Sequence, residues 1–298
     1  MSIFAYGQTG SGKTWTMEGD RACPAQWGII PRSVDLIFER CARLGEQGWA
    51  TELRVEMLEI HNECIRDLLS ARGGGGGSGA SAASARAASA AASAAASLDL
   101  RTCPKTGAVR VEGLTSAPVR SAEDVHALIA RASAARATGA TRMNERSSRS
   151  HMVFTLRIAA SRAGSRESRA GTLHLVDLAG SERLDKSGVG EGGAGGGGGG
   201  GGAGSTSSSS GGGNKMLTET ININSSLLAL GACVSALQAR APHVPYKNSK
   251  LTQLLSEALG GKDARTLILC TLNPLHANAS ESLSTLRFAA NCTAVAKK

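Results

Sequence analysis

An eight-residue segment, Gly7 to Thr14, reads GQTGSGKT and fits the pattern G-x-x-x-x-G-K-[ST] at every required position. It follows an apolar run, Ile3 to Tyr6, that predicts a buried strand, and it precedes a stretch able to open a helix. Successive backbone N–H groups in such a loop, together with a helix N-terminus, form a concave anion site. The segment therefore predicts a phosphate-binding loop. At this point the alternative is a glycine-rich turn with a surface lysine.

Two side chains of this loop have the chemistry that a nucleoside triphosphate requires. The Lys13 ammonium can place a positive charge between the terminal phosphates, and the Thr14 hydroxyl can ligate Mg²⁺. The loop alone indicates a nucleotide ligand without indicating what is done with it.

Two low-complexity tracts interrupt the 298-residue chain. Residues 72–98 are nearly all Gly, Ala and Ser, and residues 192–213 are almost pure Gly and Ser. Neither tract has enough apolar side chains to offset its ordering entropy, so we expect both to be flexible insertions. The remaining 249 residues suit one large α/β domain spanning 1–298 with these insertions.

The formal net charge of +9 is spread along the chain without a block of five or six basic residues. Such a surplus favours an acidic partner, although an ordinary basic enzyme has the same composition. Few aromatic residues accompany the charge, which disfavours a platform for single-stranded nucleic acid. We therefore expect no nucleic-acid partner. We expect no membrane partner either, because no apolar run is long enough to cross a bilayer and no secretory signal is visible. Seven cysteines without a C-x-x-C pair predict reduced thiols in a cytosolic protein and no zinc site.

Apolar periodicity predicts that helices and strands alternate along the chain. The short polar link between two predicted strands, 152–158 and 172–177, suits antiparallel neighbours. The predicted class is therefore α/β with a mixed sheet. Helices are expected at 33–44, 121–136, 216–238, 249–258 and 280–295, and further strands at 51–61 and 266–272.

Two further segments contain residue types that a phosphate site needs. Asp177 ends a predicted strand and can hold Mg²⁺ through water, and Gly180 can offer its N–H to a γ-phosphate. Residues 144–151 read NERSSRSH, which places two hydroxyls and an amide where they can coordinate a metal and position water. Arg149 in that segment is available to pair with a carboxylate. Taken alone, each segment also fits an ordinary turn.

In this order, GQTGSGKT, NERSSRSH and DLAGSE resemble the phosphate loop, switch I (144–151) and switch II (177–182) of kinesin motor domains. The segments SIFAYGQTGSGKTWTM, ININSSLLALGACVSAL, HVPYKNSKLTQLLSEALGG and STLRFA extend the resemblance over essentially all of the chain outside the tracts. MLEIHNECIRDLL and NERSSRSHMVFTLRI are most similar to the C-terminal-motor, minus-end-directed kinesins. The resemblance implies a P-loop NTPase fold of the kinesin type, with a mixed central sheet flanked by helices.

The resemblance also implies ATP hydrolysis with Mg²⁺, coupled to microtubule binding, in the cytoplasm on the microtubule cytoskeleton. It implies that Arg149 and Glu182 form a salt bridge between the switches, which aligns the hydrolytic water, and that Trp15 can stack on the base. The implied nucleotide-binding residues are Gly7, Gln8, Thr9, Gly10, Ser11, Gly12, Lys13, Thr14 and Trp15. The implied catalytic residues are Asn144, Ser147, Ser148, Arg149, Gly180 and Glu182. The implied metal ligands are Thr14, Ser148 and, through water, Asp177, and the implied microtubule-binding residues are His243, Tyr246, Lys247 and Lys250.

Several departures from the family pattern keep other hypotheses open. Family members have further strands and a helix ahead of the phosphate loop, so we expect this chain to lack the first strands and to leave the edge beside 266–272 unpaired. The tract at 192–213 lengthens the loop after switch II, and Ser225 stands where the family usually has a lysine. A degenerate, non-catalytic microtubule-binding module is therefore the second hypothesis. A nucleic-acid-dependent ATPase is the third and rests on charge alone, while oligomerisation is expected to use regions absent from this chain.

Overall fold

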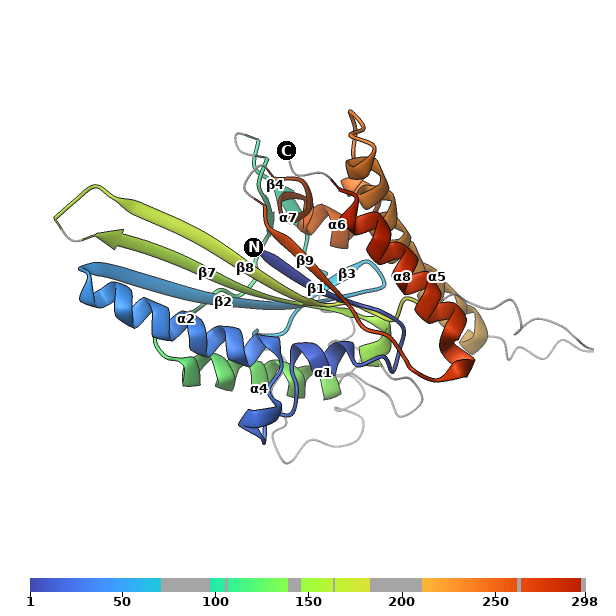
Figure 1. Ribbon diagram of the computed structural model, residues 1–298, viewed down its shortest axis with the longest axis horizontal. Coiled ribbons are helices and arrows are strands. Elements are labelled where there is room, and N and C mark those ends of the chain that lie inside the picture. The colour runs from blue at the N-terminus through green and yellow to red at the C-terminus, as the bar shows by residue number, and fades with distance from the viewer. Residues whose placement is uncertain are drawn as a thin grey trace, which may run out of the picture.

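The structure is a computed structural model that describes residues 1–70, 97–104, 107–138, 146–162, 164–182, 211–261 and 264–295. Residues 138, 146–147 and 211–223 are described by their backbone alone. In this part of the chain, a central twisted sheet has helices on both of its faces (Figure 1).

The described sheet has seven strands and mixed pairing. Its order is β3-β2-β7-β8-β1-β9, with β6 also paired to β2. β1 runs parallel to both β8 and β9, whereas the pairs β2–β3, β2–β6, β2–β7 and β7–β8 are antiparallel. The predicted mixed sheet and the antiparallel link are therefore confirmed. The strands are β1 (Ser2–Tyr6), β2 (Trp49–His61), β3 (Cys64–Asp67), β6 (Ala117–Val119), β7 (His151–Arg162), β8 (Ser168–Asp177) and β9 (Thr266–Cys270), and β4 (Leu100–Thr102) pairs separately with β5 (Val109–Val111).

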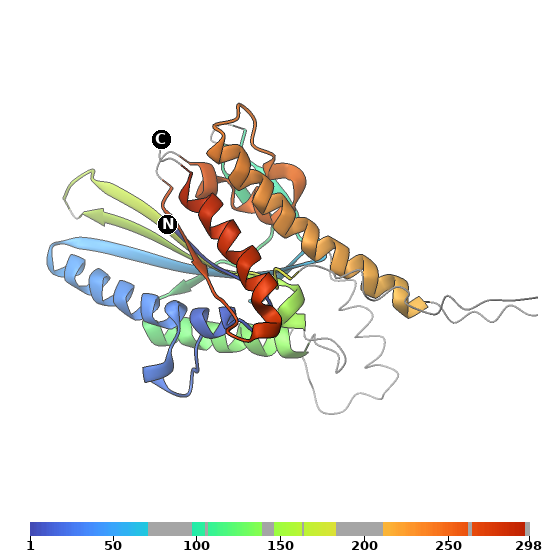
Figure 2. The same cartoon turned by 45° about the vertical axis from the view of Figure 1, so that its right-hand side comes forward.

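Two groups of helices cover the two faces of the sheet. In Figures 1 and 2, α1, α2 and α4 lie on one face, and α5, α6, α7 and α8 lie on the other. The α-helices are α1 (Lys13–Met17), α2 (Ile29–Glu46), α4 (Ala122–Thr138), α5 (Gly211–Gln238), α6 (Lys250–Leu254), α7 (Ser256–Gly260) and α8 (Ala279–Thr293). The 3-10 turns are η1 (Pro24–Gln26), η3 (Arg146–Arg149), η5 (Tyr246–Asn248) and η6 (His276–Asn278). Within the described ranges, none of the helices has both the length and the apolar character that crossing a bilayer demands.

The alternation of side chains along β1 divides the core between the two faces. Ile3 and Ala5 join the apolar cluster beneath α2 and α4, whereas Phe4 joins the cluster beneath α5 and α6. Successive side chains of a strand point to opposite faces, so a central strand contributes to both layers. This explains why the run before GQTGSGKT is apolar without alternation.

Helix boundaries differ from the predicted ones for local reasons. α2 begins at Ile29 and includes Pro31, which a first helical turn tolerates because its N–H groups have no intrahelical acceptor. The helix predicted at 249–258 is two helices, α6 and α7, that meet at Leu255. The predicted cap at Ser280 is wrong, because the N-cap position of α8 is Asn278 and makes no side-chain cap bond. α5 begins at Gly211, within the last three residues of the second tract.

β9 and α8 expose an apolar surface at one end of the sheet. In the described part of the chain, β9 pairs only with β1, and α8 packs against it. An open strand edge beside exposed leucines favours association with another chain. The exposed leucines of this surface are Leu267, Leu272, Leu275, Leu283 and Leu286.

We predict that the chain self-associates through this surface and that Leu286→Glu shifts it toward the monomer. Leu286 is 49% exposed, so the change should alter the free energy of unfolding by less than about 0.5 kcal/mol. Sedimentation velocity over a concentration series measures the effect. Leu36→Glu, at a 51% exposed leucine of α2, is the control, and an equal effect from it would contradict the assignment.

Candidate functional site

The phosphate loop leaves β1 at Gly7 and enters α1 at Lys13. A Cβ atom on Gly7 would lie 2.3 Å from the carbonyl oxygen of Thr271, so only glycine fits where the loop passes the end of β9. The φ angles of Gly10 and Gly12 are +75° and +95°, a left-handed conformation that glycine adopts without strain. In the part of the chain that the structure describes, no heavy atom would lie within 4 Å of a Cβ at either position, which leaves the loop open on that side.

β9 holds the loop from its other side. The Thr271 N–H donates to the Tyr6 carbonyl at 2.9 Å, and the hydroxyls of Thr271 and Ser11 are hydrogen-bonded at 2.7 Å. Ser11 Oγ also donates to the Gln8 carbonyl at 2.8 Å. The loop backbone is therefore fixed by the residue that follows β9 as well as by its own turn.

Lys13 points back into the loop and is buried. Its Nζ donates to the Gln8 carbonyl at 2.8 Å, and the residue is only 7% exposed. Burial lowers the pKa of Lys13, while the nearby carboxylates of Asp177 and Glu182 oppose that shift. The loop thus contains a poorly solvated positive charge, which favours an anionic ligand.

Thr14 and Asp177 form the candidate metal cradle. Thr14 Oγ1 donates to Asp177 Oδ2 at 2.6 Å, whereas the buried Oδ1 of Asp177 has no hydrogen-bond partner among the described residues. Burial raises the pKa of Asp177, which is 2% exposed, although the Thr14 hydrogen bond and the charges of Arg136 and Lys13 oppose that shift. A hydroxyl beside a carboxylate with one unpaired oxygen fits Mg²⁺, because this cation binds few protein ligands and keeps several of its waters. Among the described residues, no group of three or more His, Cys, Asp or Glu side chains forms a conventional metal cluster.

Switch II lies against the phosphate loop through its backbone. The Gly180 N–H donates to the Ser148 carbonyl of switch I at 2.9 Å, and the Ser181 N–H donates to the Gly7 carbonyl at 3.1 Å. Leu178 N donates to the Ala5 carbonyl of β1 at 3.3 Å. The three predicted segments therefore converge at one end of the sheet.

Glu182 contacts the phosphate loop rather than switch I. Its carboxylate accepts hydrogen bonds from the backbone N–H of Thr9 at 2.9 Å and from the Thr9 hydroxyl at 2.6 Å. No ion pair joins it to Arg149 in the described residues, and the buried Nη1 of Arg149 has no hydrogen-bond partner. The inter-switch salt bridge is therefore absent from this arrangement and stays a prediction for another one. Asn144 and the Ser147 side chain lie outside the described residues.

His151, the last residue of NERSSRSH, makes a link that sequence reasoning missed. Its Nδ1 accepts a hydrogen bond from the Ala179 N–H at 3.0 Å, and its Nε2 lies 2.8 Å from Ser226 Oγ on α5. The signal was a histidine at the start of an otherwise apolar strand. A buried imidazole needs polar partners, but the sequence does not say which ones.

The sequence matches the kinesin motor domain over residues 1–194 and 202–295. The chain belongs to the kinesin motor domain family. It is 42% identical over 292 residues to "Kinesin-like protein KIN-14C" of Arabidopsis thaliana, covering 98% of this chain and 33% of that protein. This kinesin sequence thus spans about a third of the length of that relative.

Solved structures agree with this assignment. A fast kinesin gives a TM-score of 0.77 at 34% identity, covering 100% of this chain and 71% of that one. The C-terminal motor and motor homology domain of Kar3Vik1, fused to a synthetic coiled coil, gives 0.72 at 34% identity, covering 98% of this chain and 63% of that one. Both the kinesin fold and the resemblance to C-terminal motors are therefore confirmed.

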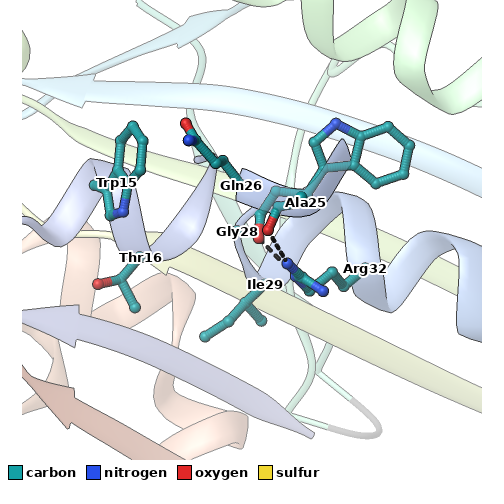
Figure 3. Close-up of a pocket in the computed structure, with 8 residues that line it drawn as sticks. Trp15, Thr16, Ala25, Gln26, Gly28, Ile29 and Arg32 are labelled. Atoms are coloured by element: carbon teal, nitrogen blue, oxygen red, sulfur yellow. Dashed lines mark hydrogen bonds between the residues drawn. The ribbon is translucent and has the colours of Figure 1, made fainter. Parts of the chain in front are cut away.

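Beside the kinesin phosphate loop, Trp15 lines a shallow pocket (Figure 3). Trp15 is 58% exposed, so its ring is accessible for stacking, and its proposed contact with the base stays a prediction. Arg32, across the pocket, donates to the carbonyls of Trp27 at 2.6 Å and Ala25 at 2.9 Å, which fixes the pocket wall. The other lining residues are Thr16, Gln26, Gly28 and Ile29.

The predicted filament-binding residues of this kinesin differ in accessibility. His243 and Lys247 are exposed, whereas Tyr246 is half-buried and its hydroxyl lies against Gly260. Lys250 Nζ is engaged within the chain, 3.2 Å from Asp99 Oδ1. These residues lie between the end of α5 and the start of α6.

We predict that Gly12→Ala lowers the free energy of unfolding by about 1–2 kcal/mol, because an L side chain is strained at its left-handed φ. Gly45→Ala is the control, since Gly45 lies within α2 with open space at its Cβ and should raise that free energy by about 0.5 kcal/mol. Urea unfolding followed by circular dichroism measures both. Equal effects would contradict the backbone assignment.

We also predict that acid destabilises the fold through His151. Burial lowers the pKa of His151 to about 3, whereas an unfolded histidine titrates near pH 6.5. The unfolded chain therefore binds the extra proton below pH 6.5, and the free energy of unfolding falls by up to about 1.4 kcal/mol per pH unit between pH 6 and 4. His151→Asn should flatten this slope in urea titrations at several pH values. Parallel curves for wild type and variant would rule out the contribution.

Proposed function

We propose that this kinesin motor domain hydrolyses ATP with Mg²⁺ and couples its nucleotide state to microtubule binding. The observation that carries the proposal is the convergence of Lys13, Thr14 and Asp177 around one glycine loop, with Gly180 beside it. The same elements form the phosphate loop and switches named from sequence. The fast kinesin structure to which the chain is similar concerns an ATPase mechanism and interactions with microtubules.

Phosphate binding uses the loop backbone and one lysine. The open side of the loop at Gly10 and Gly12 accepts the phosphates, together with Gln8, Thr9 and Ser11. In the proposed complex, Lys13 exchanges the Gln8 carbonyl for the terminal phosphates. That exchange replaces a neutral acceptor by a charged one, and charge-assisted hydrogen bonds are about twice as strong.

Thr14, Ser148 of switch I and, through water, Asp177 would hold Mg²⁺. The cation would neutralise charge that develops on the phosphates. Asp177 Oδ1 is available as an acceptor there, because it has no hydrogen-bond partner among the described residues. Thr14 already donates to the other oxygen and so keeps the carboxylate oriented.

Hydrolysis then depends on positioning by the two switches. In the proposed complex, the Gly180 N–H leaves the Ser148 carbonyl and donates to the γ-phosphate. The Glu182 carboxylate leaves Thr9 and pairs with Arg149, and this salt bridge orients the attacking water. Asn144 and Ser147 close the site from switch I. Fixed donors and charges of this kind lower the barrier without a covalent intermediate.

The microtubule face comprises α5 and the segment from His243 to Lys250. Its exposed residues include His243 and Lys247, and a basic side chain there favours the acidic surface of tubulin. The half-buried Tyr246 packs beneath the segment, and Lys250 joins the microtubule face once its ion pair with Asp99 is broken. The proposed location is the microtubule cytoskeleton of the cytoplasm.

Phosphate release with and without microtubules tests the proposal. We predict that wild type turns over ATP, that microtubules stimulate the rate, and that Lys13→Ala lowers it by about 10²-fold or more because a charge on the transferred phosphoryl group is lost. Arg40→Ala, which removes one exposed positive charge from α2, is the matched control and should retain the rate. Turnover in Lys13→Ala equal to wild type would contradict the site.

A degenerate microtubule-binding module is the second candidate. The observation in its favour is Glu182, whose carboxylate is bound to Thr9 rather than to Arg149. Co-sedimentation with microtubules but no stimulated phosphate release would leave this candidate alone. Glu182→Gln would then leave co-sedimentation unchanged.

A further inference from the structure

His151 lies between the nucleotide site and the helix that packs over the sheet. It is the first residue of β7, and it is 2% exposed. In the ladder, Ile60 of β2 pairs with His151 and Asp177 of β8 pairs with Met152. The imidazole therefore lies where switch II leaves β8.

The two hydrogen bonds of His151 fix its tautomer. Nδ1 accepts the Ala179 N–H at 3.0 Å and therefore carries no proton. Burial lowers the pKa of His151 to about 3, so the ring is neutral near pH 7 and its proton is on Nε2. Nε2 then donates to Ser226 Oγ at 2.8 Å. One rigid ring thus connects the switch II backbone to α5.

The Ala179 amide belongs to a run of four consecutive switch II amides, each bonded to a different part of the protein. Leu178 N bonds to β1, Ala179 N to His151, Gly180 N to the Ser148 carbonyl, and Ser181 N to the Gly7 carbonyl. Any movement that turns the Gly180 N–H toward a phosphate breaks its bond to Ser148. The Gly180 N–H belongs to the peptide plane that begins at the Ala179 Cα, so its rotation must be taken up at the φ and ψ angles of Ala179, next to the amide bonded to His151.

α5 is well placed to receive such a shift. Ser226 is 3% exposed and is followed by Leu227, which packs with Leu230 in the cluster that also contains Leu178. Leu178 is itself the residue before Ala179. Packed cores respond to displacement as units, so a shift at Ala179 meets both a hydrogen bond and apolar contacts of α5.

We propose that His151 is a positioning residue that couples switch II to α5, through Ala179 on one side and Ser226 on the other. The proposal rests on the proposed function, because the signal it passes on is the arrival or loss of the third phosphate. Its role is distinct from phosphate or metal contact, since both ring nitrogens are engaged away from the loop. Removal of one hydrogen bond should therefore uncouple the helix without removing the nucleotide site.

The test compares Ser226→Ala with Ser161→Ala in the 298-residue chain. Both variants remove one hydroxyl, but Ser161 is an exposed residue of β7 outside the proposed microtubule face, whereas Ser226 is buried on α5. For each protein, the microtubule dissociation constant is measured with ADP and with a nonhydrolysable ATP analogue, and the ratio is the coupling. Affinity for the analogue without microtubules and the thermal midpoint report on the nucleotide site and on folding.

We expect Ser226→Ala to reduce the ratio by about fivefold or more, within the usual range of allosteric coupling, while analogue affinity stays as in wild type. Ser161→Ala should retain the ratio, and so should Ser226→Thr, which keeps the hydroxyl. His151→Asn keeps an acceptor near the Nδ1 position and loses the donor to Ser226, so it should reproduce Ser226→Ala. The variant with both His151→Asn and Ser226→Ala should show no further loss, because each change breaks the same hydrogen bond between His151 and Ser226.

Three outcomes would overturn the coupling by His151. These are an unchanged ratio in a folded Ser226→Ala, an equal loss in Ser161→Ala, and additive losses in the double variant. In each case wild type still shows coupling, so the proposed motor function survives. If the microtubule affinity of the wild-type chain does not depend on the bound nucleotide, both proposals are overturned together.

Discussion

The parallel pairing of β1 with β8 is the constraint on which the site depends. Ala5 pairs with Asp177 in this register, so the phosphate loop and switch II leave the sheet side by side at the same edge. Parallel strands bring their carboxyl ends together, which is where open α/β sheets bind ligands. The hydrogen bond from Thr14 to Asp177 and the one from Ser181 to Gly7 both follow from this register. An antiparallel pairing would place these segments at opposite ends of the strands.

Burial of charge at this edge explains why a polyanion with a divalent cation suits the site. Burial lowers the pKa of Lys13 and raises that of Asp177, so each charged form is disfavoured where it stands. A phosphate chain would favour the charged form of Lys13, and a cation would favour the charged form of Asp177. In the described structure, Lys13 Nζ donates to the neutral Gln8 carbonyl, and Asp177 accepts from the neutral Thr14 hydroxyl. A phosphate bound together with a cation therefore stabilises the charges of Lys13 and Asp177 more than either ion alone.

Sequence patterns predicted the parts of the fold that depend on local chemistry. The capping box at α4 is present as predicted, since Ser121 and Asp124 exchange hydrogen bonds at 3.2 and 3.1 Å. The strands β3 and β6 were missed because three or four residues are too few to establish an alternating pattern. The contact of Glu182 with Thr9 and the link from His151 to Ser226 were also missed. Their partners lie 173 and 75 residues apart in sequence, and local periodicity carries no information about such pairs.

The contacts of Thr271 with the phosphate loop connect the outer strand β9 to the conformation of that loop. Thr271 follows β9 directly, and its backbone passes so close to Gly7 that a single methyl group would not fit between them. A segment that pairs along the open side of β9 would hold Thr271 still and stiffen the loop, whereas fraying of β9 would loosen it. We therefore expect ligand affinity at the phosphate loop to depend on what pairs with β9, although β9 lies one strand away from β1, which leads into the loop.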